Sequence, residues 1–180
     1  MKNCALFSIL ATSACMLMTL ATPAVLAGTH QHKAHVHGEA NLNIVIDQNN
    51  VLIELESPAA NLLGFEHAPH TSAEKQQLKA TQSLLSKPST LLSITNNQCQ
   101  SVNTDIELPF SDHDDHHSDH SEIHAEYTLQ CQSDKAITQL NIRLFSHFPD
   151  MQKLTIMWIK NSQQGSITLT PDDHQIILPK

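Results

Sequence analysis

Apolar and polar residues alternate with a period of two over most of this chain. Between Val36 and Asp47 the apolar residues other than Val45 share the even positions, and alternation resumes at odd positions between Val51 and Glu56, with Leu52 as the exception. The polar residues Gln48–Asn50 separate the two runs. Strict alternation is typical of a half-buried strand, and an Asn-rich connection is typical of a tight turn. The sequence therefore predicts a β-hairpin in this region.

A second pair of alternating runs lies further along the chain. Val102–Leu108 alternates before Pro109, and Ile123–Cys131 alternates after a segment rich in His and Asp. Antiparallel pairing of these runs would place Cys99 opposite Cys131 at the open end and the His/Asp segment at the tip. Cys99 is out of phase with Val102, so we expect a β-bulge or a one-residue adjustment between them.

The remaining elements are shorter. Thr71–Glu74 has the pattern of a capping box, and the apolar spacing that follows predicts one helix over Ser72–Ser86, after a loop over Asn61–His70. Further strands are expected at Leu91–Ile94, Leu140–Leu144, Leu154–Lys160, Ile167–Leu169 and Gln175–Leu178, with a turn at Gln163–Gly165. We expect a mainly β fold: an antiparallel β-sandwich or half-open barrel with one short helix and a mobile His/Asp-rich hairpin loop.

The N-terminus has the features of a secretory signal peptide. Lys2 precedes an apolar stretch, and Val25-Leu26-Ala27 offers small residues before Gly28, so we expect cleavage after residue 27. Residues 28–180 would then form a single domain that carries the His-rich loop 111–121. No other segment approaches the roughly 18 apolar residues of a membrane span, so we expect no membrane insertion after cleavage.

Charge and cysteine content narrow the possible functions. Ten Lys and Arg residues face eighteen Asp and Glu residues, and the formal net charge is −8 at pH 7. This balance disfavours nucleic acid and anionic membranes as partners and favours cations. Cys99 and Cys131 are the two cysteines that would remain after cleavage. In an exported chain such a pair is more often a disulfide than a redox or metal-binding pair.

Histidine is unusually frequent, with thirteen residues in a chain that has 4% aromatic residues. His35 and His37 stand two residues apart on a predicted strand, so both imidazoles would project from the same face. His124 lies on the polar face of a later strand. Neutral imidazole and carboxylate are good ligands for Zn²⁺ when several converge. We expect these three histidines to form an ordered site with one carboxylate, provided that the first hairpin neighbours the later strand; an exposed polar face is the alternative.

Two further groups of histidines are candidate ligands. Ser111–Ser121 contains no apolar residue and carries His113, His116, His117 and His120, so we expect it to collect zinc ions weakly. His67 lies in the loop before the predicted helix, where it is either a second ligand or a packed loop residue. No motif of a known catalytic class is present, and we expect the protein not to be an enzyme.

Several motifs resemble those of the ZrgA family of exported bacterial zinc-uptake proteins. They are His35-x-His37-Gly38-x-Ala40, the segment Ser57-Pro58-Ala59-x-Asn61-Leu62-x-Gly64-Phe65-Glu66-His67-Ala68-Pro69, the His-rich insert leading into His124-Ala125-Glu126-Tyr127 and Cys131, and Leu144-Phe145-x-x-Phe148-Pro149. The resemblance spans His35 to Leu178. It implies a periplasmic zinc-binding component of a Gram-negative zinc import system, with a membrane ABC-type zinc importer as partner.

The sequence thus favours a periplasmic protein that captures Zn²⁺ and delivers it to a membrane importer. A periplasmic buffer or chaperone for copper or nickel is an alternative, because these ions bind imidazole sites with comparable or higher affinity. A structural or adhesion-type β domain with incidental histidines is another.

Overall fold

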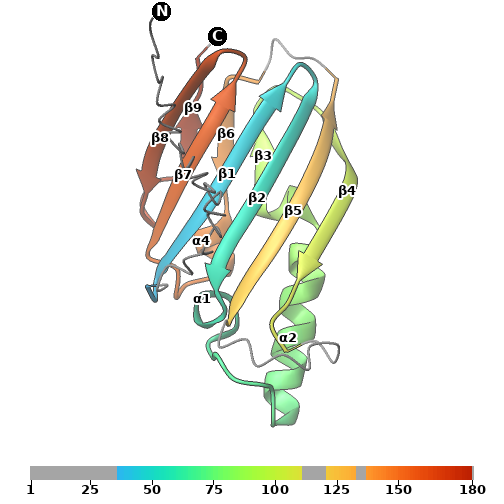
Figure 1. Cartoon of the computed structure of the whole chain (residues 1–180), viewed down its shortest axis with the longest axis vertical. Coiled ribbons are helices and arrows are strands. Elements are labelled where there is room, and N and C mark those ends of the chain that lie inside the picture. Colours follow the sequence, from blue (N-terminus) through green and yellow to red (C-terminus); the bar gives the residue numbers. More distant parts are fainter. Residues whose placement is uncertain (1–35, 111–120, 133–136, 180) are drawn as a thin grey trace, which may run out of the picture. The chain divides into compact units, whose positions relative to one another are not determined.

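The alternating runs form strands, and these strands assemble into two sheets. The structure, a computed structural model, describes residues 36–110, 121–132 and 137–179. Six strands form a large sheet in the order β4-β5-β2-β1-β7-β8, and three form a small sheet in the order β3-β6-β9 (Figure 1). Their bounds are β1 Glu39–Asp47, β2 Asn50–Pro58, β3 Leu92–Ile94, β4 Cys99–Glu107, β5 Glu122–Cys131, β6 Gln139–Ile142, β7 Lys153–Lys160, β8 Gln163–Leu169 and β9 Gln175–Ile177.

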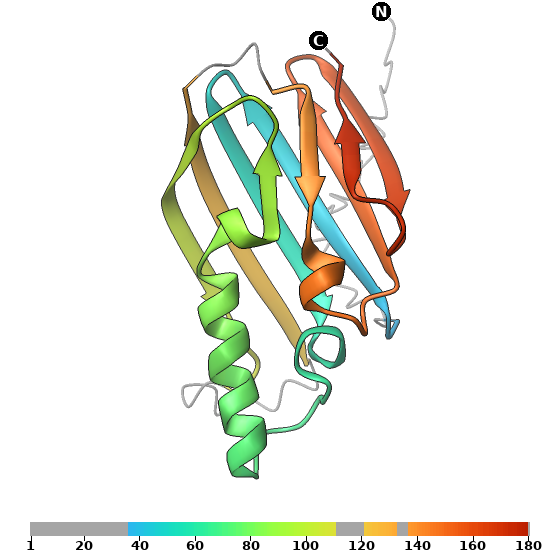
Figure 2. The same cartoon turned by 180° about the vertical axis from the view of Figure 1, so that it is seen from behind.

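The expected sandwich is confirmed. The small sheet covers one face of the large sheet, as the view from behind shows (Figure 2). The large sheet is open, with β4 and β8 at its edges. All of these strands belong to one compact unit, Ala34–Lys180.

The described residues form four helices, whereas the sequence predicted one. The long helix α2, Ser72–Leu85, is confirmed together with its capping box: the Thr71 hydroxyl accepts from the Glu74 amide, and the Glu74 carboxylate accepts from the Thr71 amide. The other three are α1 Ala59–Leu63, α3 Pro88–Leu91 and α4 Leu144–His147. They are too short to produce helical periodicity, so α1 was expected as loop and the start of α4 as strand.

Alternation along the strands sets which side chains enter the core. On β1, Leu42, Ile44 and Ile46 are buried between the sheets, whereas the odd-numbered residues face outward. From the small sheet, Leu140 and Ile142 close the other side. Each fully buried Leu or Ile stabilises the fold by about 1.5–3 kcal/mol relative to leaving it exposed. The outward side chains of the large sheet are not part of this core.

The predicted turn at Gln163–Gly165 is wrong by two residues. The chain turns at Asn161, whose φ is 54°, and Lys160 already pairs with Gln163. Gly165 lies within β8, opposite Trp158. A Cβ at this position would collide with the Trp158 indole, so the glycine is required for close packing within a strand rather than for a turn.

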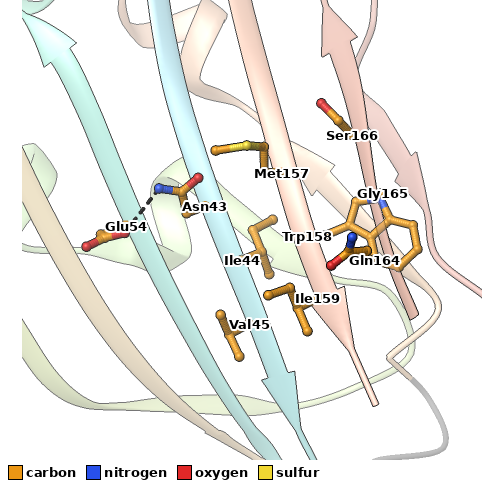
Figure 3. Close-up of a pocket in the computed structure, with 10 residues that line it drawn as sticks. All are labelled: Asn43, Ile44, Val45, Glu54, Met157, Trp158, Ile159, Gln164, Gly165 and Ser166. Carbon is orange, nitrogen blue, oxygen red and sulfur yellow. Dashed lines mark hydrogen bonds between the residues drawn. The ribbon is translucent and has the colours of Figure 1, made fainter. Parts of the chain in front are cut away.

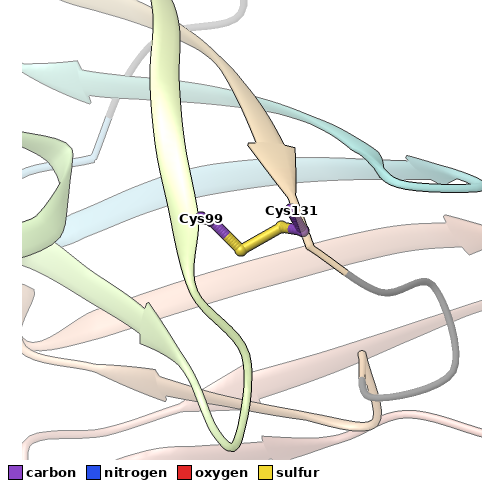
Figure 4. Close-up of a disulfide and its surroundings, with 2 residues drawn as sticks. All are labelled: Cys99 and Cys131. Atoms are coloured by element: carbon purple, nitrogen blue, oxygen red, sulfur yellow. A yellow bond between two sulfur atoms is a disulfide. The ribbon is translucent and has the colours of Figure 1, made fainter.

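The second predicted hairpin is confirmed in detail. β4 and β5 pair antiparallel with Cys99 opposite Cys131, and the two residues form a disulfide (Figure 4). The register shifts between Ser101 and Asn103, so Val102 is the bulged residue that the phase of the sequence required. The disulfide thus closes the end of this hairpin opposite the segment 111–120.

We predict that reducing this disulfide lowers the free energy of unfolding by about 3–4 kcal/mol, because it closes a loop with a sequence separation of 32. Urea denaturation with and without reductant measures the change. The double variant Cys99→Ser/Cys131→Ser is the control, and reductant should not affect it. Equal stability of the oxidised and reduced protein would contradict the prediction.

Candidate metal site

Three potential metal ligands meet on the outward face of β2 and β5. Alternation along β5 places Glu122 and His124 on the same face, and the register between the strands sets Glu56 of β2 directly opposite His124. One ligand atom from each of the three side chains lies within 4.8 Å of the other two. His124 Nε2 is 3.8 Å from Glu122 Oε2. Among the described residues this is the one group of three or more such ligands.

The donor set suits zinc. Zinc binds imidazole nitrogen and carboxylate oxygen at about 2.0–2.2 Å, which separates tetrahedral donors by roughly 3.5 Å. Side-chain rotations that move the ligand atoms by about 1 Å would bring the observed group to that spacing. The side chains of His124 and Glu122 are 46% and 20% exposed, so an ion can reach the group from solvent. The two carboxylates also favour a divalent cation electrostatically.

A second pair, His37 and Glu66, lies next to the start of β1, where a buried asparagine fixes the backbone. His37 Nε2 lies 3.0 Å from Glu66 Oε2. The backbone before β1 is fixed because the Gly38 amide donates to Asn61 Oδ1 at 2.7 Å. The Asn61 amide group in turn donates to the Glu39 carbonyl and to Ser57 Oγ. One side chain of α1 thereby joins the start of β1 to the end of β2.

Both groups lie at the same end of the sandwich. β1 and β5 start at this end and β2 ends there, next to α1 (Figure 1). The Ala59 amide of α1 donates to the Ser121 carbonyl, which connects α1 to the start of β5 at 2.6 Å. The segment 111–120 rejoins the described chain at Ser121, next to Glu122. The fold thus gathers histidine-bearing segments that are distant in sequence.

Comparison with known proteins identifies the family. The family model described as "ZrgA family zinc uptake protein" matches residues 34–178. The chain belongs to this family. A search of curated proteins finds no match. Within the part of the chain that the structure describes, no helix has the length and apolar character needed to cross a membrane.

The ZrgA-family match includes every ligand residue predicted from the sequence, but the structure describes only some of them. His35, His113, His116, His117 and His120 lie outside the described residues, as does the expected signal peptide. The ordered site was expected on the condition that the first hairpin neighbours the later strand, and this condition is met, because β2 pairs with β5. β2 also separates β1 from β5. In the described residues, His124 therefore meets Glu56 and Glu122, whereas His37 meets Glu66.

His67 lies in a different environment. Its ring stacks on Phe65 and His70, with centroids 5.3 and 5.5 Å away. Its Nε2 is 3.9 Å from Glu74, but that carboxylate already accepts the amides of Thr71 and His70. These backbone hydrogen bonds, Thr71 first, lower the pKa of Glu74. The His67 side chain is 54% exposed, so both the ligand and the packed-loop interpretations stay predictions.

Two site residues were not among the predicted ligands. Glu122 has the same parity as His124, so the sequence alone placed both on one face of the strand. To recognise Glu56 as a neighbour of His124, the register between β2 and β5 must be known. That register links residues far apart in the chain and leaves no local signal. Asn61 was part of a recognised motif, yet its role depends on two long-range hydrogen bonds, with Gly38 and Glu39, besides the local bond to Ser57.

We predict that Asn61→Ala lowers the free energy of unfolding by about 1–3 kcal/mol, because it leaves the part-buried Gly38 amide and Glu39 carbonyl without this hydrogen bond. Urea denaturation measures the loss. Asn43→Ala is the matched control, since Asn43 makes one exposed side-chain bond, to Glu54. A loss at Asn61 no larger than that at Asn43 would contradict the role assigned to Asn61.

Proposed function

We propose that this ZrgA-family protein captures Zn²⁺ in the periplasm and delivers it to a membrane zinc importer of the ABC type. The observation that supports the proposal is the group Glu56, Glu122 and His124, which matches the donor preference of zinc within a zinc-uptake family. The zinc ion is cargo in this proposal. The protein binds and transfers it without a catalytic step.

The geometry of the group suits transfer. Three protein donors leave one position of a tetrahedral ion open to water or to a ligand from an acceptor. Because His124 is half exposed, an acceptor ligand can reach the ion before the protein ligands leave. A closed four-ligand site would hold zinc more permanently, as structural zinc sites do.

The charge of the surrounding face supports capture. Outward-facing carboxylates continue from the group along β2, β5 and β4, including Glu54 and Glu126, which are register partners. Such a face raises the local concentration of cations. The segment with His113, His116, His117 and His120 is proposed from its composition to collect further ions weakly; it joins the chain one residue before Glu122.

We predict that His124→Ala and Glu56→Gln each weaken the tightest zinc site at least about tenfold, a loss of about 1.4 kcal/mol of binding free energy. The background is the chain from Gly28 with the four histidines of 111–120 replaced by Asn, so that weak sites do not mask the result. Isothermal titration with zinc measures the affinity.

Matched controls separate local from general effects. His174→Ala removes an exposed histidine elsewhere, and Glu54→Gln removes an outward carboxylate from the same strand. Both should retain the tight site. If His124→Ala binds zinc as tightly as the background protein, the site lies elsewhere. Copper or nickel that displaces zinc from the background protein at equal concentrations would favour the buffering alternative.

We also predict that zinc affinity falls at least about tenfold between pH 7.5 and 5.5. A histidine must be neutral to bind a metal, and its ordinary pKa in a peptide is about 6.5, so protons compete with zinc across this window. Carboxylate ligands titrate near pH 4 and would change little. Titration at the two pH values measures the difference, and equal affinities would exclude imidazole from the ligand set.

A further inference from the structure

An apolar groove lies on the outward face of the large sheet, away from the core. It has a volume of about 540 Å³ and lies over β1, β7 and β8. Figure 3 shows Val45 and Ile159 side by side on neighbouring strands, with Met157 further along β7. Val45, Met157 and Ile159 are 37%, 50% and 47% exposed. Leu52, opposite Val45 on β2, extends this apolar row.

The same face is strongly acidic beside the groove. Glu54 lines the groove and is the register partner of Glu126, which is opposite Asp105 on β4. Three carboxylates thus stand in one row across adjacent strands, an arrangement that costs stability unless positive charge is nearby. The outward positions of the large sheet carry the carboxylates of Glu39, Asp47, Glu54, Glu56, Asp105, Glu107, Glu122 and Glu126. Among the outward positions of these described strands, lysine occurs at Lys153, and it pairs with Glu39.

We propose that this face docks a protein segment that presents apolar side chains flanked by Lys or Arg. Apolar side chains of the partner would fill the groove over Val45, Met157 and Ile159. Its cationic side chains would neutralise the row formed by Glu54, Glu126 and Asp105. The proposal goes beyond zinc binding, because none of the groove residues is a ligand of the candidate metal site.

Charge argues against a second copy of this chain as the occupant. In a twofold-symmetric dimer the same patch meets itself, so the carboxylate rows would face each other. Opposite charge on a partner raises the rate of association by electrostatic steering and increases the specificity of binding. Exposed large apolar groups beside charged ones are typical of interaction surfaces.

The probe for the test is a fluorescently labelled seven-residue peptide of alternating Ile and Lys. Its apolar side chains recur about every 7 Å in an extended chain, the spacing of Met157 and Ile159 along β7. A peptide of alternating Ser and Lys keeps the charge and lacks the apolar side chains. Fluorescence anisotropy measures the affinity of both for the chain from Gly28, with and without zinc.

We expect the Ile/Lys peptide to bind at least about tenfold more tightly than the Ser/Lys peptide, and Met157→Thr/Ile159→Thr to abolish that difference. Thr favours strands, so the double variant should keep the sheet. Ile177→Thr on β9, where Ile177 is 69% exposed, is the matched control and should leave binding unchanged. Zinc affinity should be the same in all three proteins, which separates this test from that of the metal site.

Three results would overturn the proposal. Equal affinity for both peptides would show plain charge attraction without the groove. Unchanged Ile/Lys binding by the double variant would place the peptide elsewhere. A dimer in sedimentation that Met157→Lys dissociates would make the face an interface between copies of this chain.

Discussion

The antiparallel register between β2 and β5 is the constraint on which both the core and the candidate metal site depend. It pairs Leu55 with Ala125 in the core and, one residue along, Glu56 with His124 on the outward face. A slip of one residue would turn the carboxylate and the imidazole toward the core and the apolar residues toward water. Burial of the alternating apolar residues therefore fixes the positions of the candidate ligands on the sheet. The disulfide between β4 and β5 covalently fixes the end of β5.

The end of the sandwich where β2 ends and β5 starts combines a firm framework with accessible polar groups. Asn61 and the Ala59–Ser121 hydrogen bond join α1 to three strands. The His37–Glu66 pair and the Glu56–Glu122–His124 group lie on that framework, and His124 is half exposed. We propose that in a site built this way only side chains move when an ion binds, which suits a protein of a zinc-uptake family better than a site that must fold around its metal.

Local patterns predicted the local structure well. The period of two identified the strands of both hairpins, the capping box identified α2, and the phase of Cys99 against Val102 required the bulge. Pairings between distant segments could not be predicted. The parallel contact of β1 with β7 and the contact of β2 with β5 depend on packing of the whole sheet, so Glu56 was not recognised as a candidate ligand. Gly165 was taken for a turn residue because its packing partner, Trp158, is visible only after β7 and β8 are paired.

The central claim is that zinc binds between β2 and β5. Crystals of the chain from Gly28, grown with one equivalent of zinc and measured on both sides of the zinc absorption edge, test it directly. The account predicts an anomalous difference peak within bonding distance of His124 Nε2 and of carboxylate oxygens from Glu56 and Glu122. A fully occupied zinc peak at other ligands, with none at these three residues, would contradict it.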